Sequence, residues 1–294
     1  MDFGLMFANT GPFATAEGAT TIARAAEDAG FESVWTVEHV VVPAGYASTY
    51  PYSDTGRMPG AESTPIADPI VWLTWAAAQT TRLNVGTGIL ILPQRNPVVL
   101  AKACATLDAL SQGRLRLGVG VGWLEEEFDV IGVPFAGRGR RAEEYIDAMR
   151  ALWDDETASY SGETVAFANA ISRPAPANGR VPIIVGGHSD AAARRAGRFG
   201  DGFFPGKGDN DRLRELITIM RRAAEDAGRD PEAIELTAGG AAAFAPDPVE
   251  ALGELAEMGV TRVAIPPLSF RTDEVAERLA EFGDRVIAAV NSAG

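Results

Sequence analysis

Cysteine, histidine and positive charge are all scarce in this sequence. Cys104 is the one cysteine, so no disulfide can form within the chain, and its apolar helical setting, LAKACATLDAL, predicts a buried structural thiol. Two histidines far apart in the chain, with one buried cysteine, do not give the ligand spacing of a zinc site. We therefore expect no metal centre.

A formal net charge of −14 argues against nucleic acid and anionic membranes as partners. It leaves room for an anionic small molecule at a locally positive site. Uncharged apolar runs of membrane-spanning length are lacking. The first residues, MDFGLMFANTGPF, lack the basic start and long apolar core of a signal peptide. These absences favour a cytoplasmic protein.

Short apolar runs alternate along the whole chain with longer segments of helical periodicity. The expected strands cover residues 2–8, 33–39, 82–91, 114–122, 181–187, 202–206, 234–242 and 262–268. The expected helices cover residues 16–31, 68–81, 96–113, 138–153, 189–200, 211–228, 247–259 and 272–290. Asp68 and Asn96 each precede a proline, which is typical of a helix cap and first turn. The pattern predicts an α/β fold, a (β/α)8 TIM barrel in one domain over residues 1–294.

Two connections are too long for a plain barrel. Residues 40–67 follow the second strand and carry Tyr46, Tyr50 and Tyr52. They lie on the face where barrel active sites form, which favours an active-site lid over a passive loop. Residues 155–180 form a second insertion, in which we expect a hairpin around Ser161 and Gly162.

The ends of the strands supply the candidate site residues, because barrel enzymes build their sites there. The second strand ends in Glu38 and His39, and the fifth is followed by His188 and Ser189. Both histidines of the chain therefore fall on this face. We expect a site role for His39, while a site role and simple packing stay open for His188. The sixth strand ends near Lys207.

Glycines are concentrated at the ends of the third, fourth and fifth strands. The stretch GVGVGWLEEEF does not fit the dinucleotide fingerprint G-x-G-x-x-G. Missing side chains would instead let a flat ligand lie against the backbone. Gly186, Gly187 and Ser189 open a helix whose N–H groups suit a phosphate, although a simple chain turn is an alternative. Residues 125–127, three glutamates, favour a helix start over a cation site.

The sequence resembles the luciferase-like monooxygenase superfamily in LNVGTGILILPQRNPVVLAKACATLDALSQGRLRLGVGVGW and in VPIIVGGHSDAAARRAGRFGDGFFP. Within it, the chain is most similar to the coenzyme F420-dependent oxidoreductases. The resemblance covers nearly the whole chain. It implies a barrel with insertion loops, a deazaflavin (coenzyme F420) or FMN at its mouth, and a homodimer.

In the sugar-phosphate dehydrogenases of this superfamily an acidic residue and a histidine end the second strand, and Glu38 and His39 match them. The resemblance implies that His39 is catalytic and lies over the ring. A cis peptide that backs the ring matches Gly88–Ile89, and the phosphate loop matches Gly186–Gly187. The residues implied to bind the cofactor are Glu38, Gly88, Ile89, Gly120, Gly122, Trp123, Gly186, Gly187, His188 and Ser189.

The sequence also departs from the family pattern. Trp123 stands where those dehydrogenases have a catalytic glutamate, and Glu126 stands in place of an asparagine. These differences argue against sugar-phosphate oxidation. Val121 occupies the position of an arginine that binds the FMN phosphate in bacterial luciferase. The spacing of Lys207 differs from that of a substrate-phosphate lysine, so its role is not carried over.

The sequence thus predicts a coenzyme F420-dependent oxidoreductase that transfers a hydride between the deazaflavin and a small organic substrate. The substrate would bind beneath residues 40–67. Two alternatives stay open: an FMN-dependent luciferase-like monooxygenase, and a non-catalytic protein that binds a flavin or deazaflavin.

Overall fold

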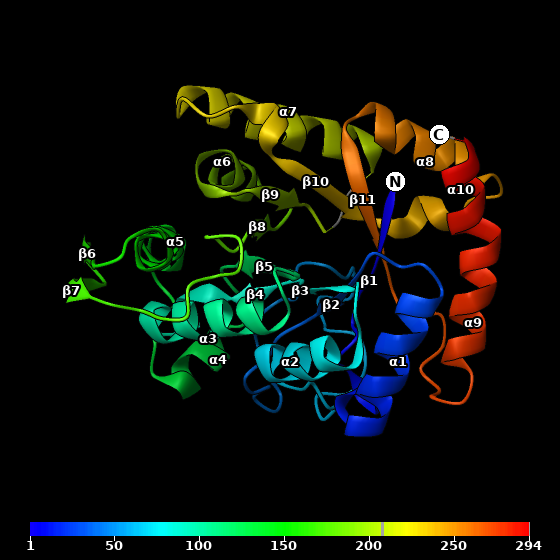
Figure 1. Cartoon of the computed structure of the whole chain (residues 1–294), viewed down its shortest axis with the longest axis horizontal. Helices are drawn as coiled ribbons and strands as arrows, with labels where there is room; N and C mark the ends of the chain where they lie inside the picture. The colour runs from blue at the N-terminus through cyan, green and yellow to red at the C-terminus, as the bar shows by residue number, and fades with distance from the viewer. Residues whose placement is uncertain (207–208, 294) are drawn as a thin grey trace.

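A closed barrel of parallel strands forms the centre of the molecule (Figure 1). This computed structural model describes residues 1–206 and 209–293, and Lys207 lies outside them. Around the barrel the strands follow the order β3 (Asn84–Thr87), β2 (Ser33–Thr36), β1 (Asp2–Leu5), β11 (Val260–Ile265), β10 (Glu235–Gly239), β9 (Gly202–Phe204), β8 (Ile183–Gly186) and β5 (Leu115–Gly120). Pairing of β3 with β5 closes the ring, which confirms the predicted (β/α)8 TIM barrel.

The barrel strands are apolar along most of their length because helices cover them outside and side chains fill them inside. Val34 of β2 lies in register with Val85 of β3, and Leu117 of β5 lies in register with Ile183 of β8. All four side chains are fully buried. The core therefore runs through the barrel and out to the helix layer.

Helices follow the strands and surround the barrel (Figure 1). They are α1 (Ala16–Asp28), α2 (Pro69–Gln79), α3 (Pro97–Leu110), α4 (Glu125–Ile131), α5 (Arg138–Asp154), α6 (Asp190–Phe199), α7 (Asn210–Asp226), α8 (Pro248–Glu257), α9 (Val275–Phe282) and α10 (Ala288–Ala293). The predicted caps are confirmed. The Asp68 carboxylate accepts hydrogen bonds from the first turn of α2, and the Asn96 side chain does the same for α3.

Three elements differ from the sequence prediction. The third strand is not continuous: it ends at Thr87, and after the cis peptide between Gly88 and Ile89, which the resemblance implied, it resumes as β4 (Leu90–Ile91) beside β5. The seventh strand ends at Gly239 and is followed by a 3-10 turn. The last helix contains a π-helical turn from Gly283, whose backbone approaches Ala29 so closely that a Cβ there would lie 2.3 Å from the Ala29 carbonyl oxygen.

The second insertion contains the expected hairpin. Strands β6 (Ala158–Ser161) and β7 (Ala166–Ala170) pair antiparallel and project from the molecule beside α5 (Figure 1). The hairpin lies between α5 and β8, and so on the side of the barrel where strands begin. Its tip extends along α5 to the first turns of that helix, where Glu163 pairs with Arg140 and Thr164 donates to Glu144.

Cys104 is fully buried in α3, and burial raises the pKa of its thiol to about 12. The prediction of a buried structural thiol is confirmed. Within residues 1–206 and 209–293, no helix combines the length and the apolar character needed to cross a membrane.

Candidate functional site

His39 lies just beyond β2 at the mouth of the barrel, and a buried glutamate fixes its ring. Its Nδ1 atom is 3.0 Å from Oε2 of Glu127, and the side chains of His39 and Glu127 are 8% and 0% exposed. The other carboxylate oxygen of Glu127 accepts from the backbone N–H of Val40 at 2.6 Å. Because an ionised carboxylate only accepts, Nδ1 carries the proton and Nε2 is left as the group that can act on a ligand.

Glu127 was missed by the sequence prediction, which explained residues 125–127 together as a helix start. The helix does begin at Glu125, but Glu127 faces inward. The helical repeat of the sequence could have identified Glu127 as an inward-facing residue. Leu124, Glu127 and Phe128 share one face of α4, and the other two are apolar and fully buried. A carboxylate on such a face requires a partner, and that partner is His39.

Glu38 is buried beside His39 but is directed at the edge of the mouth. One of its oxygens accepts from the backbone N–H of Ile91, and the other accepts from the Arg95 guanidinium, with Nε at 2.9 Å. Arg95 also donates to Asp68, the cap of α2, at 2.9 Å. Burial alone would lower the pKa of Arg95, but the carboxylates of Glu38 and Asp68 raise it overall. Glu38 thereby joins β2, β4 and α2.

The Ile89 side chain occupies the space beside two glycines at which a ligand was expected from the sequence. The Ile89 side chain lies between Gly120 and Gly186, where a Cβ would lie only 2.5 Å and 2.3 Å from it. These glycines therefore leave room for Ile89, and not, as expected, for a ligand against the bare backbone. Gly122 is similar, because its φ is +79° and a Cβ there would lie 2.8 Å from Phe128. The mouth thus presents an apolar platform, Ile89, on a rigid bulge.

Residues 40–67, called the lid from here on, extend across the mouth through aromatic contacts. Trp123 meets the rings of His39, Tyr46 and Tyr50 edge to face, at centroid distances of 5.7, 5.4 and 5.1 Å. Tyr52 continues the row and contacts His188 at 4.6 Å. The lid therefore spans the mouth from the end of β2 to the end of β8. Burial raises the pKa of Tyr50 to about 12, so its hydroxyl stays protonated.

Asn9, which follows β1, was also missed by the sequence prediction. Its side-chain amide donates to the carbonyl oxygens of Val37 and Ala67 at 2.8 and 2.7 Å. Val37 precedes the lid by three residues, and Ala67 is its last residue. A fully buried asparagine thus holds the ends of the lid together.

The turn after β8 has the geometry expected from the sequence. Gly187 has a φ of +121°, which favours glycine. Ser189 caps α6, with its hydroxyl oxygen accepting from the N–H of Ala192 at 3.2 Å. His188 lies between this turn and Tyr52 of the lid. The turn places N–H groups at the mouth, beside the row of rings.

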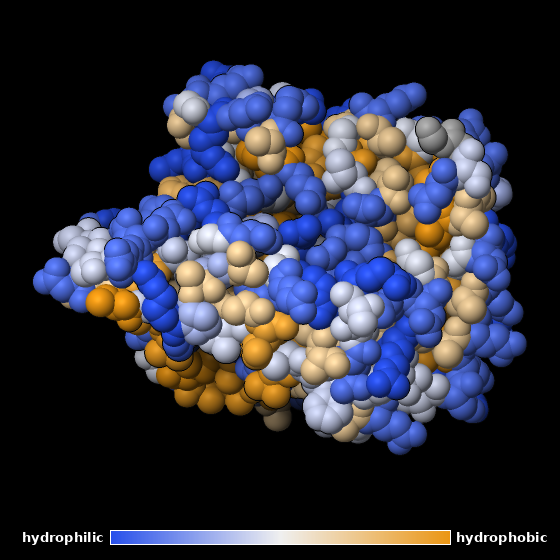
Figure 2. Space-filling view, in the orientation of Figure 1, coloured by the Kyte–Doolittle hydropathy of each residue, from blue (hydrophilic) through white to orange (hydrophobic). Residues whose placement is uncertain are grey.

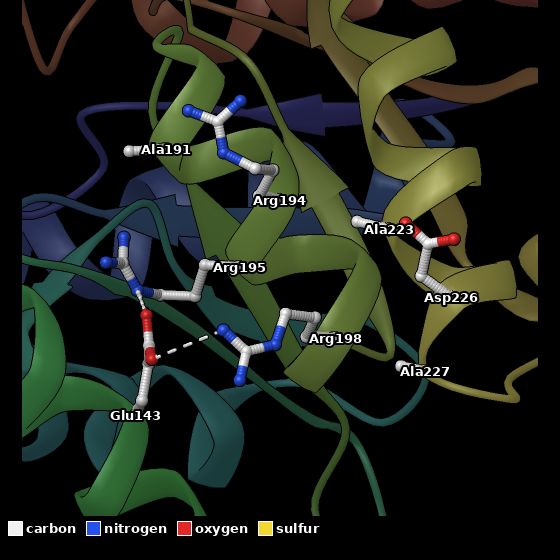
Figure 3. Close-up of a pocket in the computed structure, with 8 residues that line it drawn as sticks. All are labelled: Glu143, Ala191, Arg194, Arg195, Arg198, Ala223, Asp226 and Ala227. Atoms are coloured by element: carbon white, nitrogen blue, oxygen red, sulfur yellow. Dashed lines mark hydrogen bonds and ion pairs between the residues drawn. The ribbon is translucent and has the colours of Figure 1, made fainter.

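A surface hollow of about 550 Å³ lies elsewhere, between α5, α6 and α7 (Figure 3). Arg195 and Arg198 of α6 point toward Glu143 of α5, at 3.1 and 3.8 Å. With Arg194 and Asp226 the lining carries three positive and two negative side chains, so the hollow keeps a net positive charge. It is formed by the helix layer and contains none of the predicted site residues.

Comparison with known proteins relates the barrel to one family. The profile of the luciferase-like monooxygenases matches residues 1–287. An uncharacterized protein of Mycobacterium tuberculosis is 38% identical over 208 residues, which cover 71% of this chain and 72% of that protein. An F420-dependent glucose-6-phosphate dehydrogenase of Kineococcus radiotolerans is 33% identical over 233 residues, covering 77% of this chain and 64% of the dehydrogenase.

Among solved structures, the coenzyme F420-dependent tetrahydromethanopterin reductase of Methanopyrus kandleri has the same fold. The two chains superpose with a TM-score of 0.75 at 19% identity, covering 98% of this chain and 99% of the reductase. At this identity the likeness concerns the fold alone.

Proposed function

Because the chain belongs to the luciferase-like monooxygenase family of oxidoreductases, we propose that it is a coenzyme F420-dependent enzyme that transfers a hydride between the deazaflavin and a small organic substrate. The observation that carries the proposal is the His39–Glu127 pair at the barrel mouth. Similarity to an F420-dependent dehydrogenase over 77% of the chain supports the choice of cofactor.

The residues at the mouth fit a planar cofactor with an anionic tail. Ile89 offers an apolar platform, flanked by Gly120 and Gly186, for one face of a ring. The turn at Gly187 and Ser189 would hold a phosphate through the N–H groups at the start of α6, because the Gly187 N–H already donates to the Phe204 carbonyl oxygen. Trp123 and the lid tyrosines would close over the other side. When bound, the deazaflavin supplies or accepts the hydride.

The chain's own residues would orient the substrate and move its proton. Glu127 keeps the proton on Nδ1 of His39, so Nε2 would accept a hydrogen bond from a substrate hydroxyl or return a proton to a carbonyl oxygen. The lid would exclude water from the ring, because Tyr46, Tyr50 and Trp123 pack against one another across the mouth. Both directions of hydride transfer are compatible with this arrangement.

Cofactor titration tests the proposal. The purified protein is titrated with coenzyme F420 and with FMN in parallel, and binding is followed by fluorescence. We expect micromolar or tighter affinity for the deazaflavin and weaker affinity for FMN. Binding of FMN alone would overturn the proposal.

A second candidate is an FMN-dependent monooxygenase. Membership of the luciferase-like monooxygenase family favours it. In that enzyme FMN would supply the oxygen activation, and His39 would offer Nε2 as a hydrogen-bonding group beside the ring. Oxygen consumption with reduced FMN distinguishes the two candidates, because deazaflavin lacks the nitrogen that makes oxygen activation easy.

The quaternary structure we propose is a homodimer through the outer faces of α2 and α3. Val71 and Val99 on these helices are 71% and 68% exposed, and Trp75 lies one turn after Val71. The space-filling view shows further apolar side chains along the lower left edge, near α3 and α4 (Figure 2). Exposed apolar surface on adjacent helices is typical of an interface. A cytoplasmic location is also part of the proposal, and cell fractionation tests it.

A further inference from the structure

The first turn of α4 holds the lid at two places. Glu127 accepts from the N–H groups of Val40 and Val41, where the lid begins. Glu126 accepts from the N–H groups of Ala47 and Ser48, at 2.6 and 3.0 Å, and from the Ser48 hydroxyl at 2.6 Å. One helical turn thus carries the partner of His39 and binds the part of the lid next to Tyr46.

Ser48 returns a hydrogen bond to the same helix. Its hydroxyl oxygen accepts from the N–H of Glu125 at 3.2 Å. The residue at the cap position, Leu124, has no side chain able to do this. The first N–H groups of a helix lack partners within it, so the lid provides a cap that α4 itself lacks. Lid and helix therefore stabilise each other.

The bonds at Glu126 are charge-assisted, which makes them stronger than hydrogen bonds between neutral groups. The Ser48 hydroxyl, followed by the backbone N–H groups, lowers the pKa of Glu126 to about 2. The carboxylate is therefore ionised throughout the pH range in which the protein would work. Glu125, the neighbouring acid, differs, because its side chain acts on Arg138 and only its backbone meets Ser48.

We propose that Glu126 is a positioning residue, which holds the lid closed through Ala47 and Ser48 and, through the shared turn of α4, keeps Glu127 against His39. The consequence for catalysis rests on the proposed function. The closed position of the lid and the proton position on the His39 ring do not rest on the proposed function, because both can be measured without cofactor or substrate.

Limited proteolysis tests the closure. Arg57 is the only lysine or arginine of the lid, and its guanidinium lies 4.7 Å over the Tyr46 ring. Arg57 is exposed, but its guanidinium donates to the Tyr46 carbonyl oxygen and the Met58 N–H donates to the Tyr46 hydroxyl, so trypsin can cleave the Arg57–Met58 bond only after these contacts open. We expect Glu126→Ala to be cleaved there at least about tenfold faster than the wild type, because opening no longer breaks charge-assisted bonds. Glu125→Ala, the matched control, should be cleaved at the wild-type rate.

The partner residue provides a second variant. Ser48→Ala should also accelerate cleavage, and combining it with Glu126→Ala should add less than the product of the two single effects, since both remove the same contact. Glu126→Gln retains an acceptor for the two N–H groups and should have an intermediate rate. It also keeps the test valid if Glu126→Ala does not fold.

The link to His39 is tested by histidine NMR. The chain has two histidines, and His39→Asn assigns their signals. In the wild type, the ring nitrogens of His39 should report a proton on Nδ1. In Glu126→Ala they should shift toward the values of Glu127→Gln, whereas Glu125→Ala should leave them unchanged.

Two results would overturn the proposal: wild-type cleavage of Glu126→Ala and Glu126→Gln, or unchanged His39 signals in both. Failure of the proposed function is separate. If coenzyme F420 does not bind while cleavage and NMR respond as expected, the cofactor assignment is wrong and the positioning role of Glu126 stands.

Discussion

At the scale of single residues, the site depends on a pair separated by 88 positions in the chain. His39 follows β2 and Glu127 lies in the first turn of α4, with 3.0 Å between Nδ1 and Oε2. A carboxylate on one ring nitrogen fixes the proton there and leaves the other nitrogen basic. The same carboxylate holds the start of the lid through Val40. A change at Glu127 should therefore alter both the histidine and the lid.

We expect His39→Ala to lower kcat by about 100-fold or more, the scale of general acid–base catalysis, with little change in cofactor affinity. Glu127→Gln keeps a hydrogen-bonding group at the ring but removes the charge, and it should lower kcat by about 10-fold. Steady-state kinetics with parallel cofactor titrations measures both. Unchanged turnover in His39→Ala would refute its catalytic assignment.

At the scale of elements, the interrupted third strand determines what the mouth presents. Glycines at positions 120 and 186 make room for Ile89, which the cis peptide directs toward both of them. The glycines of β5 and β8 are therefore packing partners of the bulge between β3 and β4. Three neighbouring strands together build one platform.

This packing predicts that Gly186→Ala destabilises the fold, because its Cβ would lie 2.3 Å from Cγ2 of Ile89. Overpacking of this kind costs about 1–3 kcal/mol. Ile89→Ala removes the opposing atoms, so the double variant should be more stable than the sum of the single effects predicts. Denaturant unfolding of the four proteins measures the coupling. Strictly additive effects would contradict the packing.

At the scale of the whole molecule, the barrel leaves apolar side chains on two adjacent outer helices. Val71 and Trp75 of α2 and Val99 of α3 are more than 45% exposed, whereas the buried faces of the same helices pack on the barrel. Exposure of these side chains to water does not stabilise a monomer, whereas a homodimer would bury them.

We expect light scattering to give the mass of a dimer for the wild type and a lower mass for Val71→Lys combined with Val99→Lys, because the charges would oppose burial. Phe244→Lys is the control, since Phe244 is also exposed, at 51%, but lies in the turn after β10, across the barrel from β3. Circular dichroism confirms the fold of each variant. A monomeric wild type would contradict the proposed interface.

The sequence by itself determined the barrel, since alternating apolar runs and capped helices are local patterns that each segment carries alone. It also placed His39 and residues 40–67 at the mouth, because strand ends are ordered by the chain. The start of α6 at Ser189 is local as well, whereas the cis peptide at Gly88–Ile89 was expected only from the family resemblance.

Only the tertiary structure decided which residues meet. Glu127, Glu126 and Asn9 act through partners 28 to 88 positions away, and no local pattern specifies such contacts. Gly120 and Gly186 were expected to leave space for a ligand, because a sequence does not show which atoms occupy the space beside a glycine. The folded barrel fills it with Ile89, which packs there because an empty space in a protein core costs stability.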